Sequence, residues 1–433
     1  MPTPRDRQAR VATWAAFFVQ GLCFATLLTH VIDLQHAFGL SDGDLTLVLL
    51  LVPLIAGVGS VAAAPLAARY GSAPVLRLSQ LAVCAVVVLM GWNGQLAGLY
   101  VLSAAFGLFV GAVDAAMNMQ AVAVERRYGM SVLTGFHAVW SVGSMLGAGL
   151  NSAFRALEVD LAWAFSVPMV LGALVSLALL PRLYGAAEER VPQRAATGHA
   201  GEHAMEHAVG GTAENAGRNT AEHPGEDAPA GPPAREGRER TAPVRVPWRP
   251  IIPLCLAMAF LYVGDAAVSN YSTVYMEKAL AASEWLVPLA YFAYQAAMLL
   301  ARVPGDLAVR RHGPAPVVRA GAVVGALGAL GVVIAPGPVV AVLAFGLVGV
   351  GLSVIAPQSF SAAGRLGAGA ETAIARVNLF NYVGFVVGAA VVGTINDTVD
   401  VRTAFVPAVV LIALIVPLAG GFRPRPATAP AAS

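Results

Sequence analysis

Two polar side chains interrupt the apolar stretch "GAVDAAMNMQAVAVE" at residues 111–125. Asp114 and Asn118 are four residues apart, so on a helix they share one face with Gly111. A carboxylate at the centre of a membrane-spanning helix costs about 3 kcal/mol, so it is rarely left facing lipid. The spacing therefore predicts either a site that takes up and releases a proton or cation, or a hydrogen-bonded contact between helices.

Other apolar stretches carry polar residues that could contact a substrate or a proton. A histidine ordinarily titrates near neutral pH, and antiparallel packing of its helix could bring His137 close to Asp114; a histidine at a helix–helix contact is the alternative. Asp265 is the second acid that we expect to contact a proton or substrate. The full set of candidates for proton coupling or substrate binding is Asp114, Asn118, His137, Asp265, Asn378, Asn381 and Tyr382.

The composition places these residues in a lipid bilayer. The 433 residues are 57% hydrophobic and only 12% charged, whereas a soluble globular chain carries about 25% charged residues. A spanning helix needs roughly 20 apolar residues, and twelve such segments can be read between glycine, proline and charged residues. They are residues 11–33, 45–68, 75–93, 97–124, 131–152, 161–181, 249–274, 285–308, 316–335, 338–360, 372–394 and 401–421.

The distribution of arginine predicts the orientation of these segments, because cytoplasmic loops carry an excess of positive charge. If the amino terminus is cytoplasmic, the inner connections receive most of the arginines and the outer connections most of the acids. Examples on the inner side are Arg69, Arg77, Arg126, Arg127, Arg310, Arg311 and Arg319. We therefore expect both termini and the long central loop to be cytoplasmic.

The chain is expected to have three parts. Residues 1–181 form an amino-terminal six-helix bundle, residues 182–248 a disordered cytoplasmic linker, and residues 249–433 a second bundle with a tail. The linker is rich in Ala, Gly, Pro, Glu and Arg and has no apolar period. Its three histidines at a spacing of four (His199, His203, His207) would suit a metal only on a helix, which the flanking Gly and Pro disfavour.

An internal repeat supports two bundles. The connection "GSAPVLR" at residues 71–77 recurs as "GPAPVVR" at residues 313–319, at an offset of 242 residues. The same offset, within a residue or two, aligns "GFHAVWSVGSMLGAG" with "NLFNYVGFVVGAA". In transporters built from parallel repeats, the substrate site lies near the bilayer midplane between the halves.

Several stretches resemble a known family. They are "FFVQGLCFA", "DAAMNMQAVAVE", "FHAVWSVGSMLGA", "GDAAVSNYSTVY" and "ARVPGDLAVRRHG". Together with the twelve segments and the repeat, they resemble the major facilitator superfamily (MFS) of secondary transporters, and within it the YbjJ-like branch of bacterial inner-membrane proteins. The resemblance spans both halves and implies the MFS fold, an all-α membrane protein of two pseudo-symmetric six-helix bundles.

The sequence departs from the superfamily at one loop. The signature Gly-x-Leu-Ala-Asp-Arg-x-Gly is "APLAARYG" here, with Ala68 in place of the aspartate, and Arg310 occupies the equivalent position in the second half. Glu125 and Asp306 are the acids that could replace it by pairing with arginines at an inner gate; for Arg302 and Asp306 a purely structural ion pair is the alternative. The candidate gate residues are Arg69, Glu125, Arg302, Asp306 and Arg311.

These patterns predict a secondary transporter that moves a small organic solute by alternating access. We expect proton-coupled export of a metabolite or drug; proton-coupled uptake by symport is the alternative. The chain has no phosphate-binding loop of the form G-x-x-x-x-G-K-[ST], so ATP does not drive it directly. A membrane-embedded sensor or enzyme would need a nucleophile–base pair or a folded extramembrane domain, and neither is evident. We expect a monomer in the cell membrane, with no cofactor, no metal and no nucleic acid.

Overall fold

The structure, a computed structural model, describes residues 2–189, 246–283, 286–366 and 369–424, and these residues form helices joined by short connections. The helices of the first half are α1 (Pro4–Thr29), α2 (Val31–Phe38), α3 (Asp42–Tyr70), α4 (Ser72–Trp92), α5 (Leu96–Tyr128), α6 (Leu133–Ala156), α7 (Leu161–Leu179), η1 (Leu180–Arg182) and α8 (Ala186–Glu189). Those of the second half are α10 (Ile252–Lys278), α11 (Leu289–His312), α12 (Pro314–Ile334), α13 (Pro338–Leu352), α14 (Ile355–Gly364), α15 (Ala370–Thr398), η2 (Thr403–Phe405), α16 (Val406–Leu418) and η3 (Ala419–Phe422).

Twelve of these elements correspond to the twelve predicted spans. In the described part of the chain, ten helical stretches are long and apolar enough to cross a membrane, with α13 and α14 counted together as Pro338–Gly364. The other two spans are α6 and α11, each 24 residues long. These two helices carry His137, Ser141, Arg302 and Asp306, and they pack against each other inside the protein.

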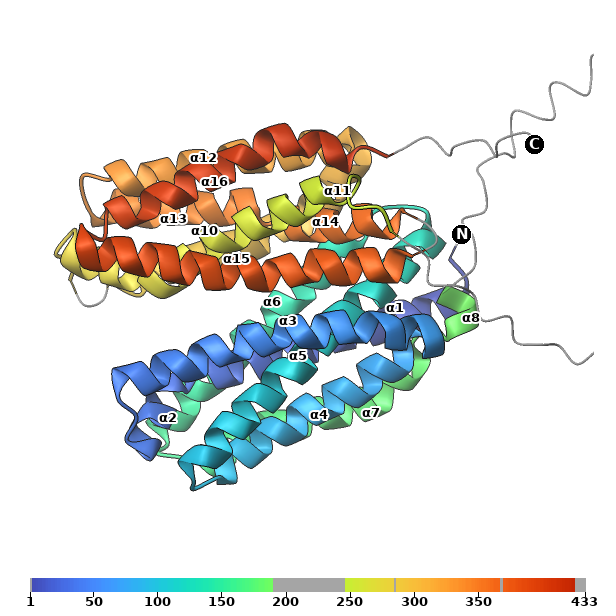
Figure 1. Ribbon diagram of the computed structural model, residues 1–433, viewed down its shortest axis with the longest axis horizontal. Helices are drawn as coiled ribbons and strands as arrows, with labels where there is room; N and C mark the ends of the chain where they lie inside the picture. Colours follow the sequence, from blue (N-terminus) through green and yellow to red (C-terminus); the bar gives the residue numbers. More distant parts are fainter. Residues whose placement is uncertain (1, 190–245, 284–285, 367–368, 425–433) are drawn as a thin grey trace, which may run out of the picture. The chain divides into compact units, whose positions relative to one another are not determined.

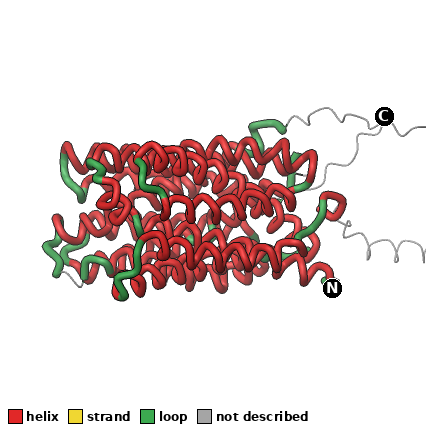
Figure 2. Tube along the Cα trace, turned by 90° about the horizontal axis from the view of Figure 1, so that it is seen from below, coloured by secondary structure: helices red, strands yellow, loops and turns green. Residues whose placement is uncertain are grey.

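The helices pack as two bundles that repeat the same contacts (Figure 1). In the first bundle α1 packs on α6, α3 on α5 and α4 on α7; in the second, α10 packs on α15, α11 on α13 and α12 on α16. The bundles meet through two equivalent pairs, α3 with α15 and α6 with α11. Figure 2 shows the helices running side by side, with their connections gathered at two ends. The predicted fold, two pseudo-symmetric six-helix bundles, is confirmed.

The repeated heptapeptide makes the same turn in both bundles. Gly71 joins α3 to α4 with φ 88° and ψ 159°, and Gly313 joins α11 to α12 with φ 83° and ψ 162°. This region of backbone conformation is essentially open only to glycine. The glycine therefore recurs in the repeat because both sharp turns need it.

Small residues set the distance between α3 and α5. A Cβ atom added at Gly111 would collide with the carbonyl oxygen of Ala56, and one added at Gly59 would collide with the carbonyl oxygen of Leu108. Close approach of backbones through glycine is typical of helix packing in membranes. The glycine beside Asp114 thus packs against α3.

Two predicted boundaries differ from the structure for local reasons. Helix α1 begins at Pro4, seven residues earlier than predicted, because Thr3 and Asp6 form a reciprocal capping box. The predicted span 338–360 is broken between α13 and α14, at Ser353 and Val354. Pro357 has no N–H to donate to the Ser353 carbonyl, which explains a break at this place.

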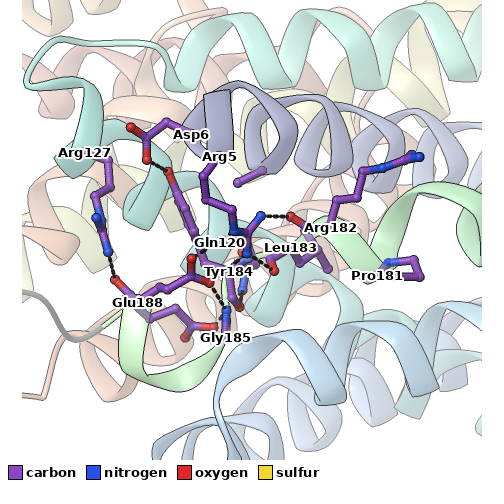
Figure 3. Close-up of polar contacts among 12 residues, drawn as sticks. Arg5, Asp6, Gln120, Arg127, Pro181, Arg182, Leu183, Tyr184, Gly185 and Glu188 are labelled. Carbon is purple, nitrogen blue, oxygen red and sulfur yellow. Dashed lines mark hydrogen bonds and ion pairs between the residues drawn. The ribbon is translucent and has the colours of Figure 1, made fainter. Parts of the chain in front are cut away.

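The predicted linker also begins later than expected. Residues 180–189, here called the closing segment, fold back across the first bundle (Figure 3). Arg5 donates to both carboxylate oxygens of Glu188, at 2.9 and 2.7 Å, and to the carbonyl oxygens of Arg182 and Leu183. The expectation of disorder from residue 182 is therefore wrong for residues 182–189.

Tyr184 attaches the middle of the closing segment to α1 and α5. It is fully buried, and its hydroxyl donates to Asp6 at 2.7 Å. Gln120 of α5 accepts from the Tyr184 backbone N–H and donates to its carbonyl oxygen. The closing segment is thus held against α1 and α5 by hydrogen bonds. The rest of the predicted linker, including His199, His203 and His207, lies outside the described residues.

Candidate functional site

Asp114 lies near the middle of α5, at the interface between the two bundles. One carboxylate oxygen accepts from the side-chain amide of Gln20 on α1 at 3.1 Å. The other accepts from the Tyr382 hydroxyl on α15, in the opposite bundle, at 2.5 Å. The acid is half-buried, and its described partners are both neutral. Asp114 is therefore joined to both bundles without an ion pair among the described residues.

The amides near Asp114 take different roles. Asn118 is 1% exposed and donates to the Asp114 backbone carbonyl at 2.8 Å, while its own side-chain oxygen has no partner. Asn378, one turn before Tyr382 on α15, donates to the Ser60 hydroxyl on α3 at 3.0 Å. Asn378 is thus a second contact between the bundles, whereas Asn381 is half-buried beside it.

Asp265 on α10, in the second bundle, shares the neighbour Tyr262 with Asp114. It accepts from the Tyr294 hydroxyl on α11 at 2.5 Å. Tyr262, one turn before Asp265, lies within electrostatic reach of Asp114, Asp265 and Arg302. We call Asp114, Tyr262, Asp265, Tyr294, Arg302 and Tyr382 the central cluster.

His137 does not hydrogen-bond to Asp114. Its ring stacks on Phe360 of α14, with centroids 6.1 Å apart, and meets the edge of Phe17 on α1 at 5.2 Å. The Nε2 atom is buried without a partner. The suggested approach of His137 to Asp114 is therefore not seen; the ring lies in an aromatic contact between the bundles.

Arg302 is buried on α11, with 8% of its surface exposed. Its Nη1 atom donates to the Ser141 hydroxyl at 2.6 Å and to the His137 carbonyl oxygen at 3.3 Å, both on α6. Its Nε atom has no partner. Arg302 thus belongs to the central cluster, and it does not pair with Glu125 or Asp306 as predicted for a gate.

Glu125 and Asp306 hold the first turn of α6 from both bundles. Glu125 accepts from the backbone N–H groups of Val132 and Leu133, at 3.0 and 3.2 Å. Asp306 accepts from the N–H groups of Thr134 and Gly135, at 3.0 and 2.8 Å. Carboxylates stabilise a helix N-terminus because its free N–H groups point at them and the helix dipole favours negative charge. The predicted acid–arginine pairs at this position are wrong, and the acids cap a helix instead.

The two remaining gate candidates lie at the surface. Arg69 is exposed and its guanidinium lies 5.1 Å from the centre of the Tyr70 ring, and Arg311 is exposed. Two other arginines, Arg126 and Arg310, make contacts between the bundles. Arg126 donates to the Gly364 carbonyl oxygen, and Arg310 donates to the Ser131 carbonyl oxygen at 2.8 and 2.6 Å.

The described hydrogen bonds between the bundles come from the middle of the helices and from the end that carries both termini. Those at the terminal end are Ser131–Asp306, Thr134–Asp306, Gly135–Asp306, Thr134–Gln358, Ser361–Glu125, Arg126–Gly364 and Arg310–Ser131. Those in the middle are Tyr382–Asp114, Asn378–Ser60, Ser60–Ala375, Arg302–Ser141 and Arg302–His137. In the part of the chain that the structure describes, hydrogen bonds therefore join the bundles at the terminal end and in the middle of the helices.

Among the residues of this site that the sequence-based candidate set omits are Gln20, Ser60, Tyr262 and Tyr294. Gln20 gives the same signal as Asn118, an amide in an apolar stretch, and could have been included on that ground. Tyr294 and Ser60 give no such signal, because a tyrosine or serine in a spanning helix is common. Their role depends on which helices meet, and the sequence of one helix does not carry that information.

Comparison with known proteins agrees with this architecture. The family model of the Major Facilitator Superfamily matches residues 13–370 and 254–433. An uncharacterized MFS-type transporter of Yersinia pestis is 27% identical over 402 residues, covering 92% of this chain and 91% of the relative. An uncharacterized transporter of Sinorhizobium fredii is 25% identical over 410 residues, covering 94% and 96%.

Solved structures show the same fold at low sequence identity. The MFS transporter FucP in its outward conformation matches with a TM-score of 0.70 and 14% identity, over 95% of this chain and 98% of that one. The human organic anion transporter MFSD10 matches with a TM-score of 0.68 and 14% identity, over 96% and 100%. The proton:xylose symporter XylE matches with a TM-score of 0.66 and 13% identity, over 96% of this chain and 95% of that one.

Two bundles of six helices, joined through a polar interface, together with the family match, define a multi-pass membrane transporter. The chain belongs to the Major Facilitator Superfamily. Since the family and the relatives are transporters of small molecules, this protein is a transporter and not an enzyme.

Proposed function

We propose that this transporter exports a small organic solute in exchange for protons, and that Asp114 is the group that takes up and releases the proton. The observation that carries the proposal is the pair of neutral donors on Asp114, Gln20 from its own bundle and Tyr382 from the other. A carboxylate away from water that has only neutral partners is poorly compensated, which makes the neutral acid a competitive state.

The same contact couples the proton to the movement of the bundles. Separation of the bundles at the terminal end would remove the Tyr382 hydroxyl from Asp114 and change how well its charge is stabilised. A ligand, here the proton, shifts a conformational equilibrium by its difference in affinity for the two states. Asp265 with Tyr294 is the equivalent acid–phenol pair inside the second bundle, and we assign it a supporting role in proton or substrate contact.

The orientation follows from the arginines. With both termini and the central loop in the cytoplasm, the joined end is the cytoplasmic end, so the described conformation is closed to the cytoplasm. The two bundles, residues 1–189 and 249–424, rock against each other around the central cluster, with the intervening chain as their tether. In this proposal the protein acts as a monomer in the bacterial inner membrane, and the resemblance of its motifs supports a member of the YbjJ-like branch.

Export is proposed from the composition of the chain, which is rich in Arg, Ala and Gly and poor in Lys, as in bacteria of high GC content. Proton-coupled uptake by symport would use the same residues and differ in the direction of flux. In export by antiport the solute moves against the direction of the protons, whereas in uptake by symport it moves with them, so the direction of solute flux under a pH gradient distinguishes the two functions.

The test is transport in proteoliposomes with an imposed pH gradient, screened across classes of metabolite. We expect wild-type flux to reverse when the gradient is reversed. Asp114→Asn should lose the response to the gradient while still exchanging substrate across the membrane, and Asp265→Asn should weaken transport. Asp397→Asn, an exposed acid at the opposite end from the termini, is the matched control. Normal gradient-driven transport by both Asp114→Asn and Asp265→Asn would show that the assignment of the proton site is wrong.

A further inference from the structure

The guanidinium of Arg302 is the least compensated charge at the interface. An arginine has five N–H donors, and the hydrogen bonds that the structure gives Arg302 both leave from Nη1. Both acceptors, the Ser141 hydroxyl and the His137 carbonyl, are neutral. No carboxylate of the described residues lies within 4.0 Å of it, because the described ion pairs are Arg5–Glu188 and Arg155–Asp33.

A buried cation without a charged partner is costly. Removing one partner from a buried ion pair costs about 3–5 kcal/mol because the other charge is left uncompensated. Asp265 is within electrostatic reach of Arg302, but its carboxylate accepts a hydrogen bond from Tyr294 instead. The protein therefore keeps a buried cation at this interface to which no described carboxylate is hydrogen-bonded.

The geometry of the unused donors indicates which anion fits. The Nε atom is buried without a partner, and the described bonds leave the edge formed by Nε and Nη2 unused. A carboxylate binds this edge with two parallel hydrogen bonds, which a hydroxyl or an amide oxygen cannot do. Next to Asp114, Gln20 Oε1 and Asn118 Oδ1 also lack partners, and so do His137 Nε2 and Gln358 Oε1 elsewhere in the protein.

We infer that the transported solute carries a carboxylate group and that Arg302 binds it through the Nε–Nη2 edge. The inference rests on the proposed transport function and names its substrate class. One carboxylate matches one guanidinium, which favours monocarboxylates over solutes with several negative charges. The unpartnered amide oxygens of Gln20 and Asn118 suit hydroxyl or amino donors on the rest of the solute.

The test measures binding to the purified full-length protein at one pH, without a membrane gradient. The probes are acetate and benzoate, compared with the uncharged acetamide and benzamide at equal ionic strength, and the readout is the shift in Tm. We expect the carboxylates to raise Tm more than their amides in the wild type. Arg302→Gln should abolish this preference, and Arg302→Lys should weaken it about tenfold in affinity, since the charge remains but the two-pronged geometry is lost.

Arg310→Gln is the matched control, because Arg310 also connects α11 to α6 but is exposed. It should keep the preference for carboxylates. If Arg302→Gln does not fold, Arg302→Lys alone carries the comparison. Equal stabilisation by acids and amides in the wild type, or an unchanged preference in the Arg302 variants, would overturn the inference. Since no proton gradient is used, that result would leave the test of proton-driven flux untouched.

Discussion

Tyr382 supplies the hydrogen bond from the second bundle to Asp114. A hydrogen bond to a charged group contributes about 1.5–3 kcal/mol. Tyr382→Phe removes the hydroxyl and keeps the ring, so it should favour separation of the bundles by roughly 10- to 100-fold. The measurement is the rate at which a thiol reagent modifies a cysteine introduced at Ala375, which is buried at the interface. Tyr291→Phe, whose hydroxyl accepts from Gln295 on the same helix, is the control; equal rates in both variants would contradict a coupling role for Tyr382.

For single residues, the sequence predicts which polar side chains in apolar helices need a partner, but it does not predict which residues those partners are. Acids and polar stripes are costly in hydrocarbon, which singles out Asp114, Asp265 and Tyr382, and all three lie in the central cluster. His137 is a candidate because histidine ordinarily titrates near neutral pH, and Glu125 and Asp306 are candidates because the loop aspartate is missing. The partners predicted for these three residues differ from those in the structure. The cost of burying a group can be read from one helix, whereas its partner depends on helices distant in the sequence.

The closing segment is an element whose attachment depends on pH. The hydrogen bonds from Arg5 lower the pKa of Glu188 below its ordinary value. A lowered pKa in the folded state means that the stabilisation is present above the ordinary glutamate range, about pH 4.3, and is lost as the pH falls further through the lowered value. A spin label at the exposed Ala187 should therefore become mobile in that acidic range. In Glu188→Gln the label should be equally mobile at all pH values; a pH-dependent label in that variant would rule out Glu188 as the titrating group.

The two equivalent turns differ in their surroundings, and this difference can be measured. Alanine at either Gly71 or Gly313 must adopt a backbone conformation that costs on the order of 1–3 kcal/mol. The added Cβ at Gly71 would also lie 2.9 Å from the Cβ of Ala186 in α8, whereas at Gly313 the nearest atom is 3.9 Å away. Both variants should have a lower Tm, with the larger decrease for Gly71→Ala. An equal decrease in Tm would show that α8 moves away from the added Cβ at position 71 without a loss of stability.

At the level of the elements, the sequence gives a correct count and approximate bounds for the spans, because apolar length decides which segments can cross a bilayer. It misses features that depend on a few atoms. The capping box at Thr3 moves the start of α1, and the absent N–H of Pro357 divides one span into α13 and α14. The closing segment reads as linker because its apolar residues, Leu183 and Tyr184, are too few to form a pattern.

For the whole molecule, the joined terminal end makes transport sensitive to a covalent bond between the bundles. Ser131 and Asp306 are in hydrogen-bonding contact across the interface, 2.8 Å apart. Cysteines at both positions, in a background without Cys23, Cys84 and Cys255, should stop transport when bridged by a short bifunctional thiosulfonate, which forms a disulfide bond with each cysteine. Reduction cleaves these disulfides and should restore transport. The transport rate of the bridged variant is compared with that of the same variant after reduction. Because both forms lack the Asp306 side chain, the loss of its contacts with α6 does not affect the comparison.

A bridge inside one bundle is the control for this experiment. Trp92 on α4 donates to the Ser166 hydroxyl on α7 at 3.0 Å, and both helices belong to the first bundle. Cysteines at these two positions should tolerate bridging, because alternating access leaves each bundle intact. Inhibition by both bridges alike would argue against movement of the bundles as units.

The contacts of Arg5 and Asp6 with the closing segment join the first residues of the first bundle to its last ones. During synthesis on a ribosome, the bundle can complete these contacts as soon as Glu189 has emerged, before any helix of the second bundle exists. A fragment that stops at Glu189 therefore retains every described contact of the closing segment with the first bundle, whereas one that stops at Leu179 lacks all of them. We therefore expect the six amino-terminal helices to fold first, so that the six later helices pack against an already folded bundle.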